Sequence, residues 1–431
     1  MLKAAGSAMG LLLFIYLRTM RTLYCWLILI GIKGTGLAQV PTFLTDVQPI
    51  IIRNCTTPCH HTGGVGPFRL LTYDDVAKRG KFIASVTRTR YMPPFPADRQ
   101  FQHYANERGL SDADIETIQA WVRGGMKKGE TPAAVSRQKE AASLAATARQ
   151  PDLVFRMKPY LVRGDGQEDF RYFHVPMNLT RDIWVEAIEF VPGNRKLVHH
   201  SRLMVDSTGT MSAINGIAEA DPKLREFQRT PLADEFLYGW VPGNDRVTFP
   251  AGAAKRIRAG SDLILNIHYA PSAKEETDQS EVRLYLARQP VDRVVRTLSL
   301  TENDVTNQPF RLAANTKPVF YMKFGPLPDS IRLLSVMPHM HRLGQSVKAF
   351  AITPDGDAIN LIQIPAWDYN WQLTYFFRQA LTLPKGTVIL AEAQYDNTDQ
   401  NPLNPNRPAR TVGYGWNSTD EMMNLVFYYI R

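Results

Sequence analysis

The stretch IWVEAIEFVPGN, residues 183–194, decides the fold of the larger part of this chain. Within it, apolar residues such as Ile183, Val185 and Ala187 recur at every second position, as they do in a strand with one buried face. The Pro-Gly-Asn sequence that follows is typical of a turn. Short segments of the same strand-like character recur at residues 263–269, 331–336 and 388–395. Short strands separated by turns predict an all-β sandwich architecture from Pro151 onward.

The β region is longer than one typical sandwich, because it runs from Pro151 to the end of the 431-residue sequence. We therefore expect two antiparallel, jelly-roll-like β-sandwich domains in tandem, with the break between residues 290 and 300. The ranges that we assign to them are 151–292 and 293–431.

Residues 40–130 instead show helical spacing and helix-capping residues, which predict a small all-α unit. A helix is expected from Phe43 to Asn54. Ser111 and Asp114 form an N-terminal capping signal for a second helix, and Gly124-Gly125 ends it. The apolar residues of this second helix recur at helical spacing at Ile115, Ile118, Trp121 and Val122. Residues 131–150, rich in Ala, Ser, Lys and Arg, are expected to be a linker. The fold class is thus multidomain: an all-α unit followed by two β-sandwiches.

The first 38 residues predict export. Arg18 and Arg21 precede an apolar run from Leu23 to Ile32, and small residues follow up to Ala38. This order is typical of a secretory signal peptide, with cleavage after Ala38. An uncleaved N-terminal membrane anchor is the alternative. We expect a periplasmic or extracellular protein that has no membrane contact once the signal is removed.

Charge and composition exclude one class of partner. The formal net charge is +9, but four of the basic residues lie in the expected signal segment. No run of Lys or Arg and no basic-aromatic stripe is present, so the sequence does not indicate nucleic-acid binding.

Cys55 and Cys59 are the only cysteines that follow the expected signal segment. They stand in the segment Cys55-Thr56-Thr57-Pro58-Cys59-His60. Two thiols followed at once by an imidazole are what covalent attachment of a c-type haem needs, with His60 as the proximal iron ligand. The usual spacing places two residues between the cysteines, and here there are three. The alternative interpretation is a plain Cys55–Cys59 disulfide, which leaves the adjacent His60 unexplained.

The region from about residue 42 to residue 128 resembles small bacterial cytochrome c domains. The resemblance consists of an entry helix that runs into the Cys-Cys-His segment, the later Met92-Pro93-Pro94, and a last helix that contains Trp121 and ends in Gly-Gly. It implies that Met92 is the distal iron ligand and that the bound haem transfers electrons. A thioether ligand would raise the reduction potential of that haem.

Six of the nine histidines lie in the β region, and five of these form three short groups. Residues i and i+2 of a strand point to the same face, so His339 and His341 can bind one metal ion together. The neighbours His199 and His200 would diverge on a regular strand, so joint binding requires a bulge or a strand end. His268 stands alone on its strand. Neutral imidazoles suit copper or zinc, and a thioether favours copper.

In the order in which they occur, these groups resemble the copper type II, ascorbate-dependent monooxygenases. The resemblance covers about residues 150–431 and includes the Asp420-Glu421-Met422 segment and the Trp367–Gln372 segment. It implies two copper ions in two β-sandwich domains. The residues of the electron-transfer copper site would be His199, His200 and His268. The residues of the catalytic, oxygen-binding copper site would be His339, His341 and Met422, with Met423 as the neighbour out of register.

Two departures from the family bear on the substrate. Members that amidate peptides carry an Arg two positions before the His-x-His pair and a Tyr four positions after the ligand Met; these positions are Met337 and Val426 here. An Arg would pair with a peptide carboxylate, so its absence argues against peptide amidation, although Asn424 matches. In addition, animal members contain several disulfides, whereas this β region has no cysteine.

The resulting hypothesis is a copper-dependent monooxygenase that hydroxylates a C–H bond of a small molecule with O₂. Electrons would come through the covalent haem c, or from ascorbate or another external one-electron donor. The alternative is a non-enzymatic haem and copper electron-transfer or copper-binding protein. A zinc-bound structural β protein is a third interpretation. The sequence does not identify the substrate.

Overall fold

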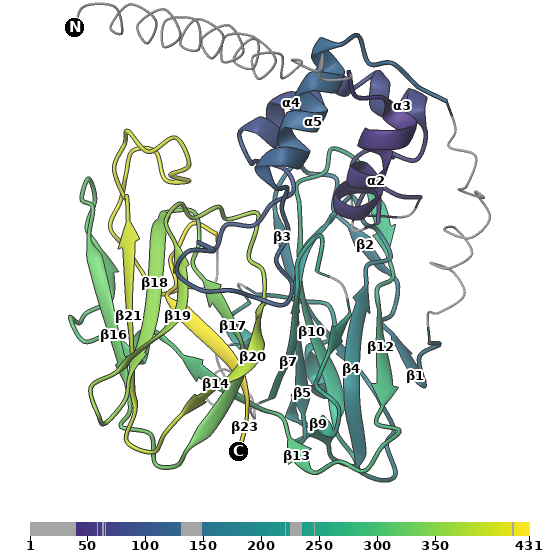
Figure 1. Cartoon of the computed structure of the whole chain (residues 1–431). Helices are drawn as coiled ribbons and strands as arrows, with labels where there is room; N and C mark the ends of the chain where they lie inside the picture. Colours follow the sequence, from purple (N-terminus) through teal and green to yellow (C-terminus); the bar gives the residue numbers. More distant parts are fainter. Residues whose placement is uncertain are drawn as a thin grey trace, which may run out of the picture.

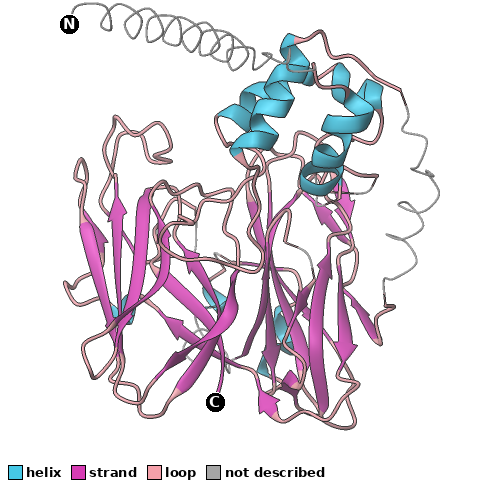
Figure 2. Cartoon of the chain, in the orientation of Figure 1, coloured by secondary structure: helices cyan, strands magenta, loops and turns pink. Residues whose placement is uncertain are grey.

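The computed structural model describes residues 40–57, 59–62, 64, 66–130, 149–219, 221–224, 235–244, 246–415 and 418–431. Most of the regular structure is β-strand, arranged in two units that lie side by side, with a helical unit at one end (Figures 1 and 2). The expected signal, residues 1–38, and residues 131–148 of the expected linker lie outside the described residues. No helix in the described ranges combines the length and apolar composition that a membrane span requires.

The helical unit has a core of its own. Phe43, Val47 and Ile51 of its first helical run pack with Ile118 and Trp121 of α5. The predicted N-cap of α5 is present: Ser111 and Asp114 form a reciprocal capping box, and Gly124 is the C-cap. The helical segments of the unit are η1 (Phe43–Val47), α2 (Gln48–Ile51), η2 (Ile52–Thr56), α3 (Tyr73–Ala77), α4 (Gly80–Arg88) and α5 (Asp112–Arg123).

The first β unit has two main sheets that face each other, besides the two-stranded sheet β11-β2 and the short β8, which pairs with β4. One has the order β1-β12-β4-β9-β13 and the other β6-β3-β10-β5-β7, with neighbouring strands antiparallel except for β13 and β9. Alternate residues such as Val185 of β4 and Leu265 of β10 meet in one core, as the two-residue periodicity predicts. The strands are β1 (Leu153–Arg156), β2 (Tyr160–Val162), β3 (Asp169–Val175), β4 (Ile183–Val191), β5 (Val198–Asp206), β6 (Ile217–Ala218), β7 (Glu235–Trp240), β8 (Val247–Thr248), β9 (Ala253–Ile257), β10 (Asp262–Tyr269), β11 (Glu276–Asp278), β12 (Glu281–Leu286) and β13 (Arg293–Val294).

The second β unit repeats this plan with the sheets β14-β23-β17-β20 and β16-β21-β18-β19. Its core joins Val336 of β17 and Phe427 of β23 to Ala349 of β18 and Ala391 of β21. The strands are β14 (Arg296–Leu300), β15 (Arg311–Leu312), β16 (Val319–Phe324), β17 (Ile331–His339), β18 (Gly344–Ile352), β19 (Ala358–Ile364), β20 (Tyr375–Leu383), β21 (Val388–Tyr395), β22 (Val412–Gly413) and β23 (Asn424–Ile430). Two short helices, η3 (Thr210–Ile214) and η4 (Glu302–Asp304), complete the elements of the two units.

The two β units pack tightly against each other. Leu334 of β17 and Tyr428 of β23 are buried in the core of the first unit, whereas the residues just before them, Leu333 and Phe427, belong to the core of the second. One sheet of the second unit therefore has two buried faces. The chain passes between the units after Val294, because β13 still pairs with β9 and the next strand, β14, pairs with β23.

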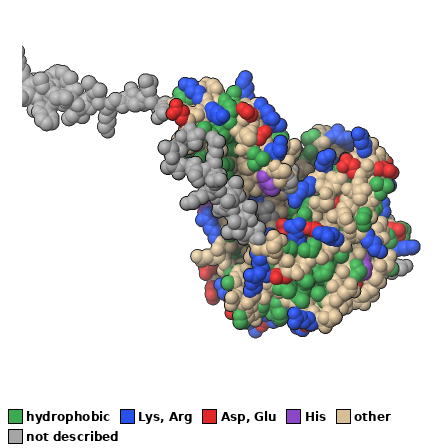
Figure 3. Space-filling model, turned by 90° about the vertical axis from the view of Figure 1, so that its right-hand side faces the viewer, with side chains coloured by type: hydrophobic (Ala, Val, Ile, Leu, Met, Phe, Trp, Pro, Cys, Tyr) green, Lys and Arg blue, Asp and Glu red, His purple; other side chains and the backbone are tan. Residues whose placement is uncertain are grey.

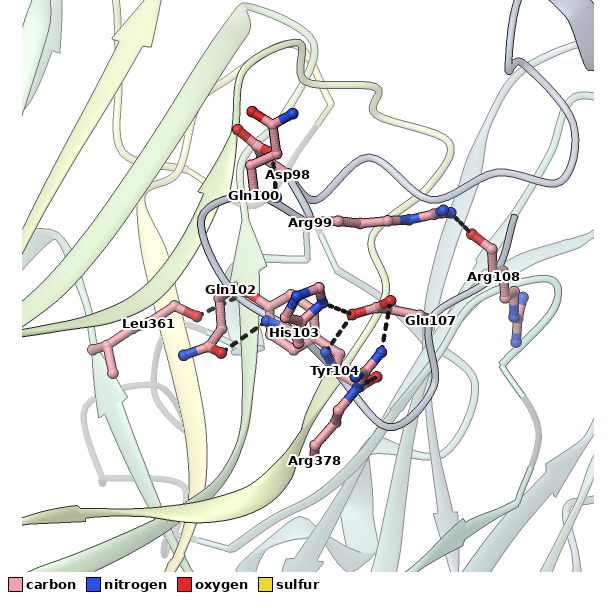
Figure 4. A network of polar contacts seen from close by, with 10 residues as sticks. All are labelled: Asp98, Arg99, Gln100, Gln102, His103, Tyr104, Glu107, Arg108, Leu361 and Arg378. Atoms are coloured by element: carbon pink, nitrogen blue, oxygen red, sulfur yellow. Dashed lines mark hydrogen bonds and ion pairs between the residues drawn. The ribbon is translucent and has the colours of Figure 1, made fainter. Parts of the chain in front are cut away.

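A loop that we call the strap, residues 95–108, connects the helical unit to both β units. Tyr104 is buried and donates a hydrogen bond to the Leu361 carbonyl (2.8 Å), and Arg378 pairs with Glu107 at 3.2 Å (Figure 4). Towards the first unit, Arg108 donates to the Gly243 carbonyl. The helical unit projects from the β units in Figure 3, where basic and acidic side chains are interspersed over the visible face. Hydrogen bonds on both sides thus hold the helical unit in place.

Candidate metal centres and their surroundings

Three histidines of the first β unit converge on one point. The Nδ1 atom of His200 lies 3.2 Å from Nδ1 of His199 and 3.4 Å from Nδ1 of His268. All three residues offer a ring nitrogen within 4.8 Å of the others. Nitrogen atoms that share one metal ion at about 2.0–2.1 Å stand roughly 3–3.5 Å apart. The cluster therefore has the spacing of a metal site.

A β-bulge produces this convergence. β10 pairs with β5 so that His268 lies opposite His200, but the next residue, Tyr269, lies opposite Val198. His199 is thus the extra residue, and the bulge rotates its side chain towards its neighbour. The bulge that the His199-His200 pair requires is present.

The surroundings keep the three imidazoles neutral and oriented. Burial lowers the pKa of His268 and of His200 well below the usual value, and neighbouring histidines lower both further. On the outer side, Nε2 of His199 lies 3.4 Å from the Asn370 side-chain oxygen, and Nε2 of His268 lies 3.7 Å from the Glu168 carboxylate. The hydrogen bond to Asn370 is of the kind that orients a metal-binding imidazole, whereas the His268–Glu168 approach is longer than a hydrogen bond; in both residues Nδ1 faces the centre.

His339 and His341 form a second cluster where β17 ends. Their rings are 5.1 Å apart and nearly perpendicular, as expected for positions i and i+2. Nδ1 of His339 contacts the Gln372 side-chain oxygen, and Nδ1 of His341 lies 3.1 Å from the Asp420 carbonyl. Burial lowers the pKa of His339 to about 3. A metal bound here would be held through the Nε2 atoms.

The structure separates Met422 from Met423. Both side chains are buried, but Met423 belongs to the core of the second unit, whereas Met422 lines the same cavity as His339 and His341. Asn424 also lines this cavity, and its amide nitrogen lies 3.7 Å from the Met422 sulfur. Of these two neighbouring thioethers, that of Met422 is therefore the one at the cavity.

Glu421 holds the second cluster together from behind. Its fully buried carboxylate accepts backbone N–H groups of His341 (2.9 Å), Leu343 (2.7 Å) and Met422 (3.0 Å). Burial raises the pKa of Glu421 to about 8, although these hydrogen bonds lower it in part. One side chain thus ties the end of β17 to the segment that carries Met422.

The two clusters border one cavity of about 550 Å³ between the β units. Its lining includes His200 of the first cluster and His339, His341 and Met422 of the second. Beside the second cluster the wall is apolar, with Met337, Pro338 and Val426. The lining also includes Arg202 and Glu219, which lie 3.8 Å apart.

Residues outside the histidine motifs complete the site. Glu168 of the first unit pairs with Arg342 of the second at 2.6 Å and also faces His268. Tyr369 and Gln372 lie in the Trp367–Gln372 segment, which is one of the segments on which the resemblance in the sequence rests. No local signal identifies Glu168, because its partners lie far away in the sequence and meet it only across the two units.

The structure places the residues of the expected haem site in the helical unit. Cys55 and Cys59 are not bridged to each other, and burial raises the pKa of Cys55 to about 12, with Cys59 adding to the shift. Nδ1 of His60 lies 2.8 Å from the Phe68 carbonyl, so Nε2 is the ring nitrogen that this contact does not occupy. Met92 is half-buried after α4, and its amide donates to Val86. Within the described residues, no hydrogen bond joins Met92 to His60.

Comparison with known protein families supports the interpretation of the second β unit. Residues 323–431 match the family described as copper type II ascorbate-dependent monooxygenase, C-terminal domain. This segment includes His339, His341 and Met422, and covers about a quarter of the chain. No curated protein matches the sequence.

Solved structures show only distant likeness. The major capsid protein P2 of bacteriophage PM2 aligns with a TM-score of 0.24 and 9% identity, over 64% of this chain and 96% of that one. The VP2 subviral particle of infectious bursal disease virus aligns with a TM-score of 0.17 and 8% identity, over 64% and 71%. A xanthan lyase from Paenibacillus has a TM-score of 0.17 and 9% identity, over 70% and 27%. TM-scores this low do not establish a shared fold or a shared function.

Proposed function

We propose that this protein is a copper-dependent monooxygenase that hydroxylates a C–H bond of a small molecule with O₂. The observation that carries the proposal is a single cavity bordered by two clusters of different chemistry, one of three imidazoles and one of two imidazoles and a thioether. The match of residues 323–431 to the copper monooxygenase family supports it.

The donor sets fit copper. Three neutral imidazoles with Nδ1 atoms 3.2 and 3.4 Å apart suit a copper ion that only changes its oxidation state. The weaker thioether of Met422 suits an ion that keeps open positions for a reactant. Bound copper would supply a stored electron at the first cluster and O₂ activation at the second.

The chain's own residues would bind and orient the substrate. The C–H bond to be attacked would lie against Met337, Pro338 and Val426, next to the second cluster. Arg202 already faces Glu219 at 3.8 Å and donates a hydrogen bond to the Tyr172 hydroxyl (2.8 Å), so the cavity favours a substrate with an apolar end and an uncharged polar end over a carboxylate.

We further propose that the helical unit carries a covalent haem c that supplies the electrons. The His60 contact with the Phe68 carbonyl supports this, because it presents Nε2 as an iron ligand. Cys55 and Cys59 would form the thioether bonds, and Met92 would be the second axial ligand. Ascorbate or another one-electron donor would reduce the haem or the first copper.

Metal and haem analysis of the purified protein tests these assignments. We expect two copper ions and one covalent haem per chain, and O₂-dependent oxidation of the reduced haem. His268→Ala should lose one copper, whereas His174→Ala should keep both, because His174 pairs with Asp262 at 2.8 Å outside the clusters.

Two results would contradict the proposal in different ways. Stoichiometric zinc without a cupric electron paramagnetic resonance signal would refute the copper assignment. Copper at the first cluster alone would instead identify an electron-transfer or copper-binding protein that hydroxylates nothing.

A further inference from the structure

The Cys-Cys-His segment of the helical unit touches the first β unit at the loop after β7. A methyl group placed on Gly243 would lie 3.6 Å from the Cys59 sulfur and 2.8 Å from the Arg108 guanidinium. Gly243 also has a φ of +88°, which side chains rarely adopt. Both the close neighbours and the positive φ therefore favour glycine at this position. The backbone of this loop lies next to Cys59, an expected point of haem attachment.

Trp240, the last residue of β7, separates this contact from the metal clusters. Its side chain is 3% exposed, and its ring lies 5.4 Å from that of Phe190. It lines a cavity of about 370 Å³ together with His61 and Gly64 of the haem-attachment loop. It also lines the cavity of about 550 Å³ that contains His200. The indole of Trp240 therefore lines both the cavity beside the haem-attachment loop and the cavity that contains His200.

Strand pairing extends the connection to the first cluster. β7 pairs with β5 so that Trp240 lies opposite Ser201, the residue that follows His200. His200 in turn lies opposite His268 on β10. The connection from Cys59 to the three histidines therefore runs through the Gly243 loop, along the chain to Trp240, and across the backbone pairing of β7 with β5.

We propose that Trp240 is the residue through which electrons pass from the helical unit to the His199, His200 and His268 cluster. The inference rests on the proposed haem and on the proposed copper at that cluster. In this step one electron leaves ferrous haem and reduces a cupric ion, so the products are ferric haem and a cuprous ion. No bond forms or breaks at Trp240, and no proton moves.

The physical reason is that electron tunnelling is much faster through bonded and closely packed atoms than across open space or water. The large indole fills the boundary between the two cavities. A smaller aliphatic residue would leave a gap there. A phenyl ring would retain most of the contact.

The strap offers a competing route, because its first residue, Phe95, and the preceding Tyr91 and Pro94 line a cavity of about 630 Å³ with Tyr369. Tyr369 lies 5.7 Å from His199. Electrons that entered from the Met92 side would therefore pass through Tyr369 rather than through Trp240. If electrons pass through Trp240, substitution of Trp240 slows the transfer and substitution of Tyr369 does not. If they pass through Tyr369, the reverse holds.

Flash reduction of the haem in oxidised, copper-loaded protein under anaerobic conditions tests the inference. Reoxidation of the haem, followed by its absorbance, reports electron transfer to copper without turnover. We expect Trp240→Leu to slow this rate at least tenfold, and Trp240→Phe less than threefold. Trp184→Leu is the matched control, since Trp184 is six residues from Phe190 on β4, about 20 Å along the strand.

Copper content and haem potential are measured for each variant, because a purely structural effect would change them as well. A Trp240→Leu rate within twofold of the parent rate, at equal copper and haem content, would overturn the inference and leave the proposed function standing. Slowing by Tyr369→Leu alone, again at equal copper and haem content, would overturn it in favour of the strap route. Protein without covalent haem would refute both the inference and the proposed electron supply, but not the copper assignments.

Discussion

The ring of Tyr369 lies 5.7 Å from the ring of His199, stacked at an angle of 24°, although the two residues belong to different β units. The same tyrosine ring lies 6.3 Å from His341. Arg342 packs over it at 5.4 Å. Burial raises the pKa of Tyr369 above its usual value, so the phenol stays protonated. One side chain therefore contacts both histidine clusters and seals the boundary between the units.

Substitution of Tyr369 should separate the role of its ring from that of its hydroxyl group. Tyr369→Leu should lower the free energy of unfolding by about 1–3 kcal/mol and weaken copper binding at the first cluster, because His199 loses its stacking partner. Tyr369→Phe keeps the ring and should change neither by much. Urea unfolding and copper titration measure both effects. Equal loss of copper affinity in the two variants would show that the hydroxyl group matters instead.

Met422 and Met423 should respond differently to the same substitution. Met422→Leu removes the Met422 thioether from the cavity, so we expect cuprous ion to bind the second cluster at least tenfold more weakly, with little change in stability. Met423→Leu is the matched control: it is a volume-conserving change in the core that should cost less than about 1.5 kcal/mol and leave copper binding intact. X-ray absorption should show loss of the sulfur ligand only in Met422→Leu.

The reverse result, with the sulfur signal lost in Met423→Leu, would exchange the roles of the two methionines.

Glu421→Gln should damage the second cluster without touching a ligand. In either orientation the amide group places an N–H₂ donor against a backbone N–H donor: against those of His341 and Met422, which donate to one carboxylate oxygen, or against that of Leu343, which donates to the other. We expect a loss of about 1–3 kcal/mol in unfolding free energy and lower copper occupancy at the second cluster, with the first unchanged. Glu392→Gln, on β21, is the control.

Full copper occupancy of the second cluster in Glu421→Gln would show that the backbone there holds its shape without the carboxylate.

Asp206, at the end of β5, should make stability depend on pH. Burial alone would raise its pKa, but hydrogen bonds from Thr208 and from the Met211 amide outweigh this and hold the pKa of Asp206 below its usual value. The folded pKa is thus lower than the unfolded one. The carboxylate therefore stabilises the fold above about pH 4, and this contribution is lost as the pH falls through the folded pKa.

Asp206→Asn should accordingly lose about 1–2 kcal/mol at pH 7. The difference from the parent protein should shrink as the pH falls below about 4. Urea unfolding at several pH values measures it, and a difference that stayed constant down to pH 3.5 would contradict the ionic origin.

The sequence alone predicts much of the fold. The alternation within residues 183–191 and 388–395 matches β4 and β21 residue for residue, and the capping signal at Ser111 marks the start of α5. It also predicts that His339 and His341 share a face and that the His199-His200 pair needs a bulge. These features depend on backbone geometry over a few residues, so the local sequence determines them.

Only the tertiary structure decides which distant side chains meet. The pairing of β5 with β10 brings His268 to His200, and the core of the second unit takes Met423 and leaves Met422 at the cavity. Glu168, Tyr369 and Trp240 acquire their places from packing between units. The physical reason is that such contacts depend on long-range strand pairing and on how the units fit together, and no periodicity within a short segment records either.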